Sequence, residues 1–183
     1  KYLKHESIHK FLKQGCIEEV KTMPYCCNPL TVAEGSKLRL VLDLRHVNQS
    51  LDFPKFKYED LRTASKHLEQ NFYFSTFDLK SGYHHISIHE QDRKYLGFSW
   101  TDETGTTRFY QFLVLPFGLA SACYVFTKVL KPLVKKWRKG GIRITVYLDD
   151  GILCANTYRL TKFQAGVVRN DLRNAGLVVN MEV

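Results

Sequence analysis

The sequence predicts an α+β fold in which an antiparallel sheet is backed by helices on one face. Residues 37 to 45 alternate apolar and polar residues, with the period of a half-buried strand. Residues 121 to 138 carry apolar residues at helical spacing. Residues 143 to 155 read as two short strands with Asp150-Gly151 as the turn of a hairpin. Because helices and antiparallel strands are mixed along the chain, segregation of the helices to one face is the expected arrangement.

The first third of the chain predicts a helix followed by a two-sided strand. The helix covers about residues 3 to 14, where the apolar residues share a face, and Gly15 ends it. The strand over 37 to 45 places four leucines on one side and polar residues on the other. The leucines are Leu38, Leu40, Leu42 and Leu44, and the opposite side carries Lys37, Arg39, Val41, Asp43 and Arg45. One side is expected to face the core and the other water or a ligand.

The pattern in the middle of the sequence predicts a strand that ends with an aspartate. A helical segment near 58 to 69 precedes the strand 71 to 78, which places Asp78 at its C-terminal end before a turn. Two strand-like runs follow at 84 to 88 and 95 to 100. A loop at 102 to 106 then leads into a further strand over 107 to 115, for which antiparallel pairing is expected.

In the last third of the sequence, the pattern predicts one helix before the hairpin and one after it. The helix over 121 to 138 has Ser121 as its expected cap and Gly140 as its stop, and Pro132 should bend it. After the hairpin, a helix over about 158 to 175 is ended by Gly176. A strand over 177 to 180 follows.

Composition favours a polyanionic partner. The chain has 183 residues, with 27 basic and 18 acidic side chains, which gives 27 − 18 = +9. Such a balance favours nucleic acid first and an anionic membrane second. No apolar run approaches the roughly 18 residues that a membrane span requires, so a soluble, intracellular protein without a membrane partner is expected. The five cysteines contain no C-x-x-C pair and are interpreted as free thiols.

One motif suggests zinc chemistry and is interpreted differently. The run from His5 to His9, "HESIH", matches H-E-x-x-H, in which two histidines one helical turn apart bind zinc. Because no third ligand follows at the spacing of such proteases, a solvated face of an amphipathic helix is favoured. The histidines at 84, 85 and 89 are interpreted as ordinary polar positions on a strand.

Three acids form the stronger candidate. Asp78 ends one strand, and Asp149 and Asp150 lie in the hairpin, so antiparallel pairing of these strands would bring two or three carboxylates together. Carboxylates in one site repel each other and raise each other's pKa, whereas Mg²⁺ prefers such oxygen ligands and completes its shell with water and substrate phosphates. Two ions about 4 Å apart serve displacement at phosphorus. The alternative is that Asp150-Gly151 only makes a bend.

The chain resembles the reverse transcriptases of retroelements, in wording those of gypsy-like and DIRS-like retrotransposons. Five segments carry the resemblance, in the order of the family: "LKQGCIEE" with "NPLTVAEGSKLRLVLDLRHVN", "FSTFDLKSGYHHISIHEQDRKYLGFSW", "FLVLPFGLASACYVF", "VYLDDGILCA" and "LRNAGLVVN". The resemblance implies a right-hand polymerase palm with a fingers lobe. It also implies metal-dependent addition of dNTPs to a primer on an RNA or DNA template.

The resemblance assigns roles to individual positions. Asp78, Asp149 and Asp150 would hold two Mg²⁺ ions, with Mn²⁺ as a substitute, and the backbone of Leu79 would join them. Arg39 and Lys37 would grip the triphosphate of the incoming nucleotide. The turn that follows Asp78 would approach the phosphates with its backbone. It comprises Lys80, Ser81 and Gly82, and the lack of a side chain suits Gly82 to this approach.

Further positions shape the nucleotide and template sites. Tyr83 would lie beneath the sugar and exclude a 2′-hydroxyl, with a core tyrosine as the alternative. Phe117 and Gly118 of "LPFGL" would contact nucleotide and template, with ordinary turn packing as the alternative. A row of lysines on the long helix would follow the template backbone or form a solvated face. These are Lys128, Lys131, Lys135 and Lys136.

The resemblance also predicts a domain division. The fingers would comprise about 1–70 with part of 85–115, and the palm about 71–84 and 116–183. Thumb and RNase H regions of the same polyprotein are expected as partners and are absent from these residues, as is a lysine near the leaving pyrophosphate. The competing hypothesis is an inactive domain that binds nucleic acid or protein as a scaffold. Family members act in cytoplasmic particles or in the nucleus, and the sequence favours neither.

Overall fold

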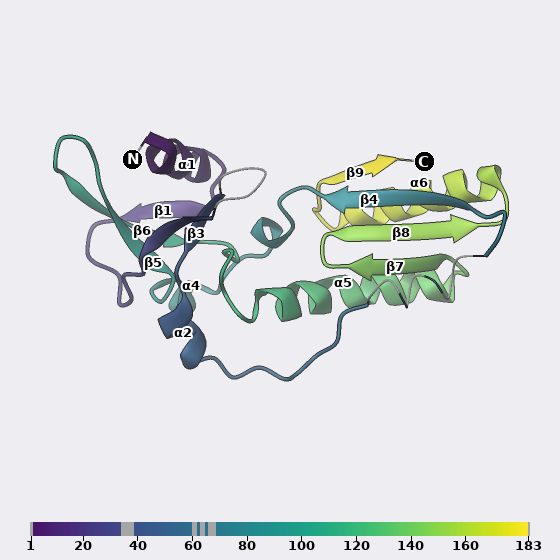
Figure 1. Cartoon of the computed structure of the whole chain (residues 1–183), viewed down its shortest axis with the longest axis horizontal. Coiled ribbons are helices and arrows are strands. Elements are labelled where there is room, and N and C mark those ends of the chain that lie inside the picture. The colour runs from purple at the N-terminus through teal and green to yellow at the C-terminus, as the bar shows by residue number, and fades with distance from the viewer. Residues whose placement is uncertain (1, 34–38, 60–61, 63–64, 66–68, 183) are drawn as a thin grey trace. The chain divides into compact units, whose positions relative to one another are not determined.

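The computed structural model describes residues 2–33, 39–59, 62, 65 and 69–182, and they form two compact units (Figure 1). The first unit comprises Lys1–Phe53 and Tyr83–Ala122, and the second comprises Pro54–Gly82 and Cys123–Val183. Each unit is therefore built from two separate stretches of chain. The division into fingers and palm remains a prediction.

The first unit contains two antiparallel sheets among its described residues. One has the strand order β1-β6-β5 and the other pairs β2 with β3. Its elements in chain order are α1 (Tyr2–Lys13), β1 (Ile17–Val20), β2 (Leu30–Ala33), β3 (Arg39–Leu42), α2 (Arg45–Gln49), α4 (Glu90–Arg93), β5 (Gly97–Thr101) and β6 (Thr107–Phe112).

The core of the first unit is aromatic and aliphatic. The rings of Phe98 and Tyr110 stack with centroids 5.2 Å apart across paired strands, and Phe112 lies 5.9 Å from Phe98. Ile8 of α1 and Leu42 of β3 are both 2% exposed in the same cluster. Burial of such side chains gives each about 1.5–3 kcal/mol, so this cluster holds the helix and both sheets together.

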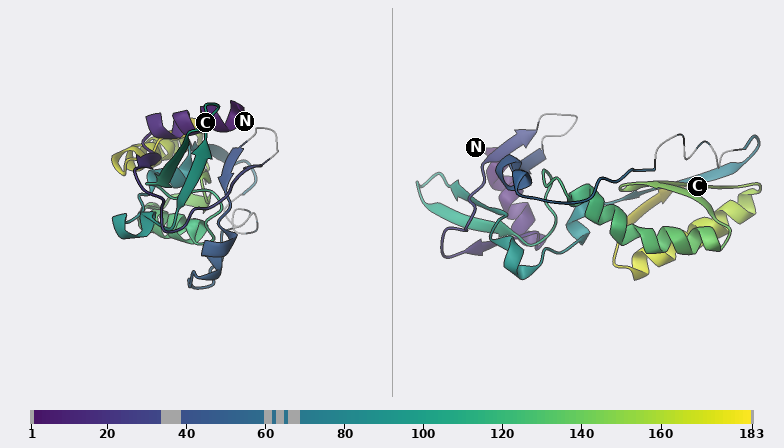
Figure 2. Two further views of the ribbon diagram at one scale, coloured as in Figure 1. Left: turned by 90° about the vertical axis from the view of Figure 1, so that its left-hand side faces the viewer. Right: turned by 90° about the horizontal axis from the view of Figure 1, so that it is seen from below.

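The second unit is an antiparallel sheet with the order β7-β8-β4-β9 among the described strands. Its elements are β4 (Tyr73–Leu79), α5 (Ala122–Lys139), β7 (Arg143–Tyr147), β8 (Asp150–Ala155), α6 (Tyr158–Asn174) and β9 (Val179–Glu182). The short 3-10 helix η1 (Gly82–His85) begins at Gly82 in the second unit and continues into the first. Figures 1 and 2 show α5 and α6 on the same side of this sheet. The predicted α+β class is confirmed.

The two helices of the second unit follow local rules. Phe126, Leu130, Val134 and Trp137 recur at intervals of four, four and three residues and are buried, so they form the inner face of α5. Thr157 caps α6 by accepting a hydrogen bond from the Leu160 N–H at 3.2 Å. Gly176 adopts φ +81° just beyond the end of α6, where a residue without Cβ is favoured.

Several predicted elements differ from those observed. The strand predicted over 37 to 45 is β3, which ends at Leu42, and Arg45 begins α2 instead. Residues 84 and 85 belong to η1, and 87 forms only an isolated bridge to Val114, so the strand predicted at 84 to 88 was wrong. Only His84 and His85 of that run lie in the turn, and a run this short does not distinguish a strand from a helical turn. Most of the helix predicted near 58 to 69 lies outside the described residues.

Candidate functional site

The acidic hairpin turns one residue pair earlier than the sequence predicted. Tyr147 pairs with Asp150, and Val146 pairs with Gly151, so the two-residue loop is Leu148-Asp149. Leu148 adopts φ 54° in that loop. Packing explains the choice: a Cβ on Gly151 would lie 2.1 Å from Cζ of Phe77 on β4. The glycine therefore makes room for a ring across the sheet instead of forming the turn.

The structure brings the predicted acids together at one end of this sheet. Asp78 of β4 and Asp150 of β8 are directly opposite partners in the register, so their side chains share a face. Both are exposed, whereas Phe77 and Leu79 on the other face of β4 are buried. The Leu79 N–H donates to the Asp149 carbonyl oxygen at 2.8 Å, which ties the hairpin loop to the end of β4.

The electrostatics of this end of the sheet are those of crowded like charges. Partial burial raises the pKa of the Asp150 carboxyl above its ordinary value, and the charges of Asp149 and Asp78 raise it further. Among the described residues, the ion pairs of Lys and Arg are made with acids elsewhere. Within the described part of the chain, no ion pair thus compensates this negative charge.

These acids do not by themselves enclose a metal ion. In the described part of the chain, no three His, Cys, Asp or Glu side chains converge closely enough to hold a metal together. Carboxylates on two neighbouring strands still fit Mg²⁺, because this ion is commonly held by one or two carboxylates together with water and substrate phosphates. The donor set suits a divalent cation whose shell is completed by a bound substrate.

The turn after β4 packs directly against the acidic loop. The Lys80 N–H donates to the Val178 carbonyl at 2.9 Å, and Ser81 adopts φ 60°. A Cβ on Gly82 would lie 3.1 Å from Cβ of Asp149 and 3.3 Å from the Phe126 ring. The absence of a side chain at Gly82 therefore lets the turn approach Asp149. Whether this turn also approaches phosphates stays a prediction.

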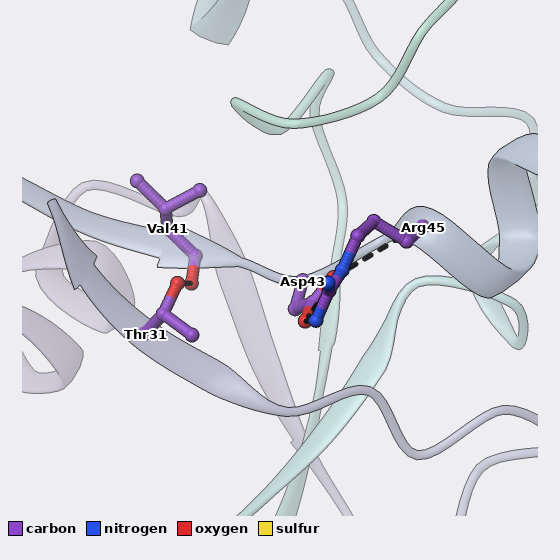
Figure 3. Close-up of polar contacts among 4 residues, drawn as sticks. All are labelled: Thr31, Val41, Asp43 and Arg45. Carbon is purple, nitrogen blue, oxygen red and sulfur yellow. Dashed lines mark hydrogen bonds and ion pairs between the residues drawn. The ribbon is translucent and has the colours of Figure 1, made fainter.

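In the first unit, Arg39 begins β3, where it pairs with Ala33 of β2. Figure 3 shows one contact within this hairpin and one just after it: the Thr31 hydroxyl donates to the Val41 carbonyl at 3.2 Å, and Arg45 forms an ion pair with Asp43 at 2.7 Å. The Arg45 guanidinium lowers the pKa of the Asp43 carboxyl. The other predicted triphosphate ligand, Lys37, lies outside the described residues.

The aromatic positions of the first unit form a cluster. The rings of Tyr83 and Phe117 lie 5.3 Å apart, and Phe117 is 37% exposed. His84 packs edge-on against Phe117 at 5.5 Å, and its Nδ1 lies 3.7 Å from Sγ of Cys16. Burial is the main cause that lowers the pKa of His84. The histidine is thus part of the packing that supports Phe117, not an ordinary polar position on a strand.

Comparison with known proteins identifies the family. Residues 35–182 match the sequence model of the family described as "Reverse transcriptase (RNA-dependent DNA polymerase)". The chain belongs to the reverse transcriptase family. Relatives include the putative enzymatic polyprotein of Cassava vein mosaic virus, 26% identical over 94% of this chain and 26% of that protein. The genome polyprotein of Petunia vein clearing virus (isolate Shepherd) is 36% identical over 80% of this chain and 7% of its own length.

A transposon relative supports the resemblance to gypsy-like elements. The retrovirus-related Pol polyprotein from transposon gypsy of Drosophila melanogaster is 33% identical over 63% of this chain and 10% of that protein. The predicted membership of the retroelement reverse transcriptases is confirmed. The chain spans between 7% and 26% of the length of the three relatives named here. The family uses divalent metal ions.

The lysines predicted to follow the template separate into two groups. Lys128, Lys131 and Lys135 are exposed, and the spacing of three and four residues places them on one face of α5. Lys136 instead forms an ion pair with Asp171 of α6 at 2.8 Å, and the Trp137 indole N–H donates to the same carboxylate at 2.9 Å. The sequence had grouped Lys136 with the other three, because a run of letters does not show which lysine has an acidic partner.

Two positioning residues were missed by the sequence. Asn48 of α2 donates to the Gly118 carbonyl at 2.9 Å and accepts from the Ala120 N–H at 2.8 Å, so it holds the loop after Phe117. Position 118 requires glycine for two reasons: its φ is +100°, and a Cβ there would lie 2.6 Å from the Leu42 carbonyl oxygen. Glu59 accepts from Val146 N–H at 3.0 Å on the edge of β7. A side chain that hydrogen-bonds to a backbone group far away in the chain cannot be recognised from the sequence pattern around it.

The sequence raised three further points: a zinc motif, the state of the cysteines and membrane spans. The H-E-x-x-H run lies on α1 and, within the residues that the structure describes, no third side chain completes a zinc site. None of the five cysteines, all of which the structure describes, forms a disulfide. No helix in the described ranges is long and apolar enough to cross a membrane.

Proposed function

We propose that this chain carries the polymerase site of a reverse transcriptase, which adds dNTPs to the 3′-hydroxyl of a primer on an RNA or DNA template. The observation that carries the proposal is the register of β4 and β8, which places Asp78 beside Asp150 next to the loop of Asp149 in a chain of this family. Thumb and RNase H regions of the same polyprotein are its proposed partners.

Asp78, Asp149 and Asp150, with the Leu79 carbonyl, would hold two Mg²⁺ ions, for which Mn²⁺ is the proposed substitute. When bound, the ions supply charge neutralisation at the triphosphate and lower the pKa of the attacking hydroxyl. The chain contributes position: the Leu79 to Asp149 hydrogen bond and the close contact at Gly82 fix the acidic loop. Preorganised charge of this kind supplies most of the catalysis in phosphoryl transfer.

The family resemblance supports the remaining assignments. Arg39 and Lys37 would bind the triphosphate, and the backbone of Lys80, Ser81 and Gly82 would approach its phosphates. The Tyr83 ring would select against a 2′-hydroxyl, supported on one side by its contact with Phe117. Gly118, held through Asn48, would let that loop approach the nucleotide.

Primer extension on an RNA template tests the proposal. The chain, within its polyprotein, is compared with its Asp149→Asn variant in the presence of dNTPs and Mg²⁺ or Mn²⁺. Loss of an outer-shell partner of a metal already costs about 10–100-fold, so loss of a ligand should reduce extension at least a hundredfold. Extension that persists in the variant would overturn the assignment of the metal site. Extension by neither protein would favour the inactive scaffold instead.

The sugar selection has a separate test. Tyr83→Val should raise the incorporation of rNTPs relative to dNTPs, because the smaller side chain leaves space for the 2′-hydroxyl. The ratio of the two kcat/KM values measures this, and Tyr110→Val, which alters another ring of the first unit, is the control. An unchanged ratio in Tyr83→Val would contradict the assignment.

A further inference from the structure

A groove of about 840 Å³ lies within the second unit, between α5 and residues 54 to 59. Its apolar lining includes Leu130 and Val134 of α5 and Val146 of β7. Leu148 of the hairpin loop also lines it, so the groove extends to the residue that precedes Asp149. The proposed transfer reaction leaves the rest of this groove unexplained.

The rim of the groove is strongly basic. Exposed lysines line it from both sides: Lys55, Lys57, Lys128, Lys131, Lys135 and Lys139. Those of α5 recur every three or four residues, so they form one row that extends about 16 Å at a rise of about 1.5 Å per residue. Within the described residues, the ion pairs of α5 are made by Lys136 and Arg138 and not by this row. The row therefore presents positive charge to a ligand.

The walls of the groove are held together before any ligand arrives. Glu59, the acid of the lining, accepts from Arg138 Nη2 at 2.7 Å and from the Val146 N–H at 3.0 Å. Arg138 also donates to the Ile144 carbonyl at 2.7 Å. Because β7 is the edge strand of its sheet, these bonds satisfy edge groups and fix both walls to it. A preformed groove lowers the entropic cost of binding.

Aromatic rings also line the groove. Phe56 and Tyr124 are half-buried in the lining, with ring centroids 5.3 Å apart. Lys128 Nζ lies 5.2 Å from the centroid of the Tyr124 ring. A lysine-rimmed groove with partly exposed rings matches the requirements of a single strand, whose phosphates and base faces are both accessible. A duplex offers phosphates while its bases stay stacked inside.

We propose that this groove binds single-stranded nucleic acid, with phosphates along the lysine row of α5 and bases against Phe56 and Tyr124. The inference deepens the proposed function and rests on it for the class of ligand. It places a strand-binding site along α5 and residues 54 to 59, in addition to the acids at the end of the sheet.

Binding of a labelled single-stranded oligonucleotide, measured by fluorescence anisotropy over a range of salt concentrations without metal or dNTP, tests the groove. Each phosphate contact to a single strand contributes about −0.7 to the slope of log K against log salt. Lys131→Ala/Lys135→Ala should therefore reduce the magnitude of the slope by about 1.4. The control, Lys136→Ala/Lys162→Ala, removes the same charge from one lysine of α5 and one of α6 that do not line the groove, and it should keep the slope. Equal loss in both pairs would overturn the proposal.

The stacking surface has its own variant. Phe56→Leu keeps an apolar side chain but removes the ring, so it should weaken single-strand binding about five-fold or more. It should leave the weaker binding of duplex and of inorganic polyphosphate unchanged, and a thermal melt confirms that the variant folds. Binding of duplex as tight as single strand, or no effect of Phe56→Leu, would reduce the groove to a general polyanion surface and overturn the proposal.

The Asp149→Asn variant separates this inference from the proposed function. It should bind the oligonucleotide as the parent does, because Asp149 is not part of the lysine row or the rings. Oligonucleotide binding by a parent that does not extend a primer supports the groove and counts against the polymerase. Extension by a parent whose binding is insensitive to Lys131→Ala/Lys135→Ala supports the polymerase and overturns the groove.

Discussion

Asp43 in the first unit and Asp150 in the second are acids at strand ends with opposite electrostatic surroundings. The Arg45 guanidinium lies against Asp43 and lowers the pKa of its carboxyl (Figure 3). Asp150 lies near Asp149 and Asp78, and both raise its pKa in addition to burial. The first acid is neutralised by its own chain, whereas the second is crowded with acids. Carboxylates whose pKa values are shifted by neighbouring charges are typical of functional sites.

The largest effect is expected from a substitution in β8, the strand that carries Asp150. Gly151→Ala should destabilise the second unit by about 1–3 kcal/mol or more, because the added Cβ overlaps the Phe77 ring and pushes β8 from β4. Urea unfolding measures the loss. Gly166→Ala is the matched control: its Cβ meets nothing within 4 Å in α6, so it should stabilise by about 0.5–1 kcal/mol. Equal effects would show that Gly151 has no packing role.

A divalent cation should distinguish the two acids directly. Mg²⁺ or Mn²⁺ at ten times its Kd should stabilise the parent by about 1.4 kcal/mol and raise its Tm, because it binds only the folded carboxylates. Asp78→Asn should lose most of this shift, whereas Asp43→Asn should keep it. A shift of the same size in both variants would contradict the assigned metal site.

Without metal, the crowding itself should be measurable. Asp150→Asn should raise Tm at neutral pH, since it removes a carboxylate whose folded pKa lies above its unfolded value. Such a group costs no stability below the unfolded pKa, near 3.9, and destabilises the fold as the pH rises through the folded pKa. The gain over the parent should therefore shrink as the pH is lowered toward 4. A gain that does not vary with pH would exclude the electrostatic cause.

The smallest effect is expected at Asp43. Its folded pKa is lowered, so its pairing with Arg45 stabilises above the unfolded pKa, and this contribution is lost as the pH falls through the folded pKa. The Arg45 side of the pair is exposed to solvent, which weakens the pair. Asp43→Asn should thus lower Tm slightly at pH 7 and less in acid, opposite in sign to Asp150→Asn. Thermal melts in low and high salt check it, and a loss that grows with salt would contradict it.

The difference between the acids was only partly predictable. The sequence predicted that Asp78, Asp149 and Asp150 would meet, because strand periodicity and the hairpin signal are local properties. It assigned the turn to Asp150-Gly151, which the structure corrected, because the Phe77 ring that excludes a Cβ there belongs to a strand far away in the chain. Likewise, the local pattern at 84 to 88 did not distinguish a strand from the 3-10 helix that Gly82 begins.

The sequence by itself determined the family, the α+β class, the helical faces and the strand that carries Asp78, since each depends on the order and spacing of nearby residues. Only the tertiary structure decided which charges are compensated. It paired Lys136 with Asp171 and left the row from Lys128 to Lys139 along the groove. It also recruited Asn48 and Glu59 to distant backbone groups. The physical reason is that hydrogen bonds, ion pairs and desolvation depend on partners brought together by folding, which spacing along the chain does not reveal.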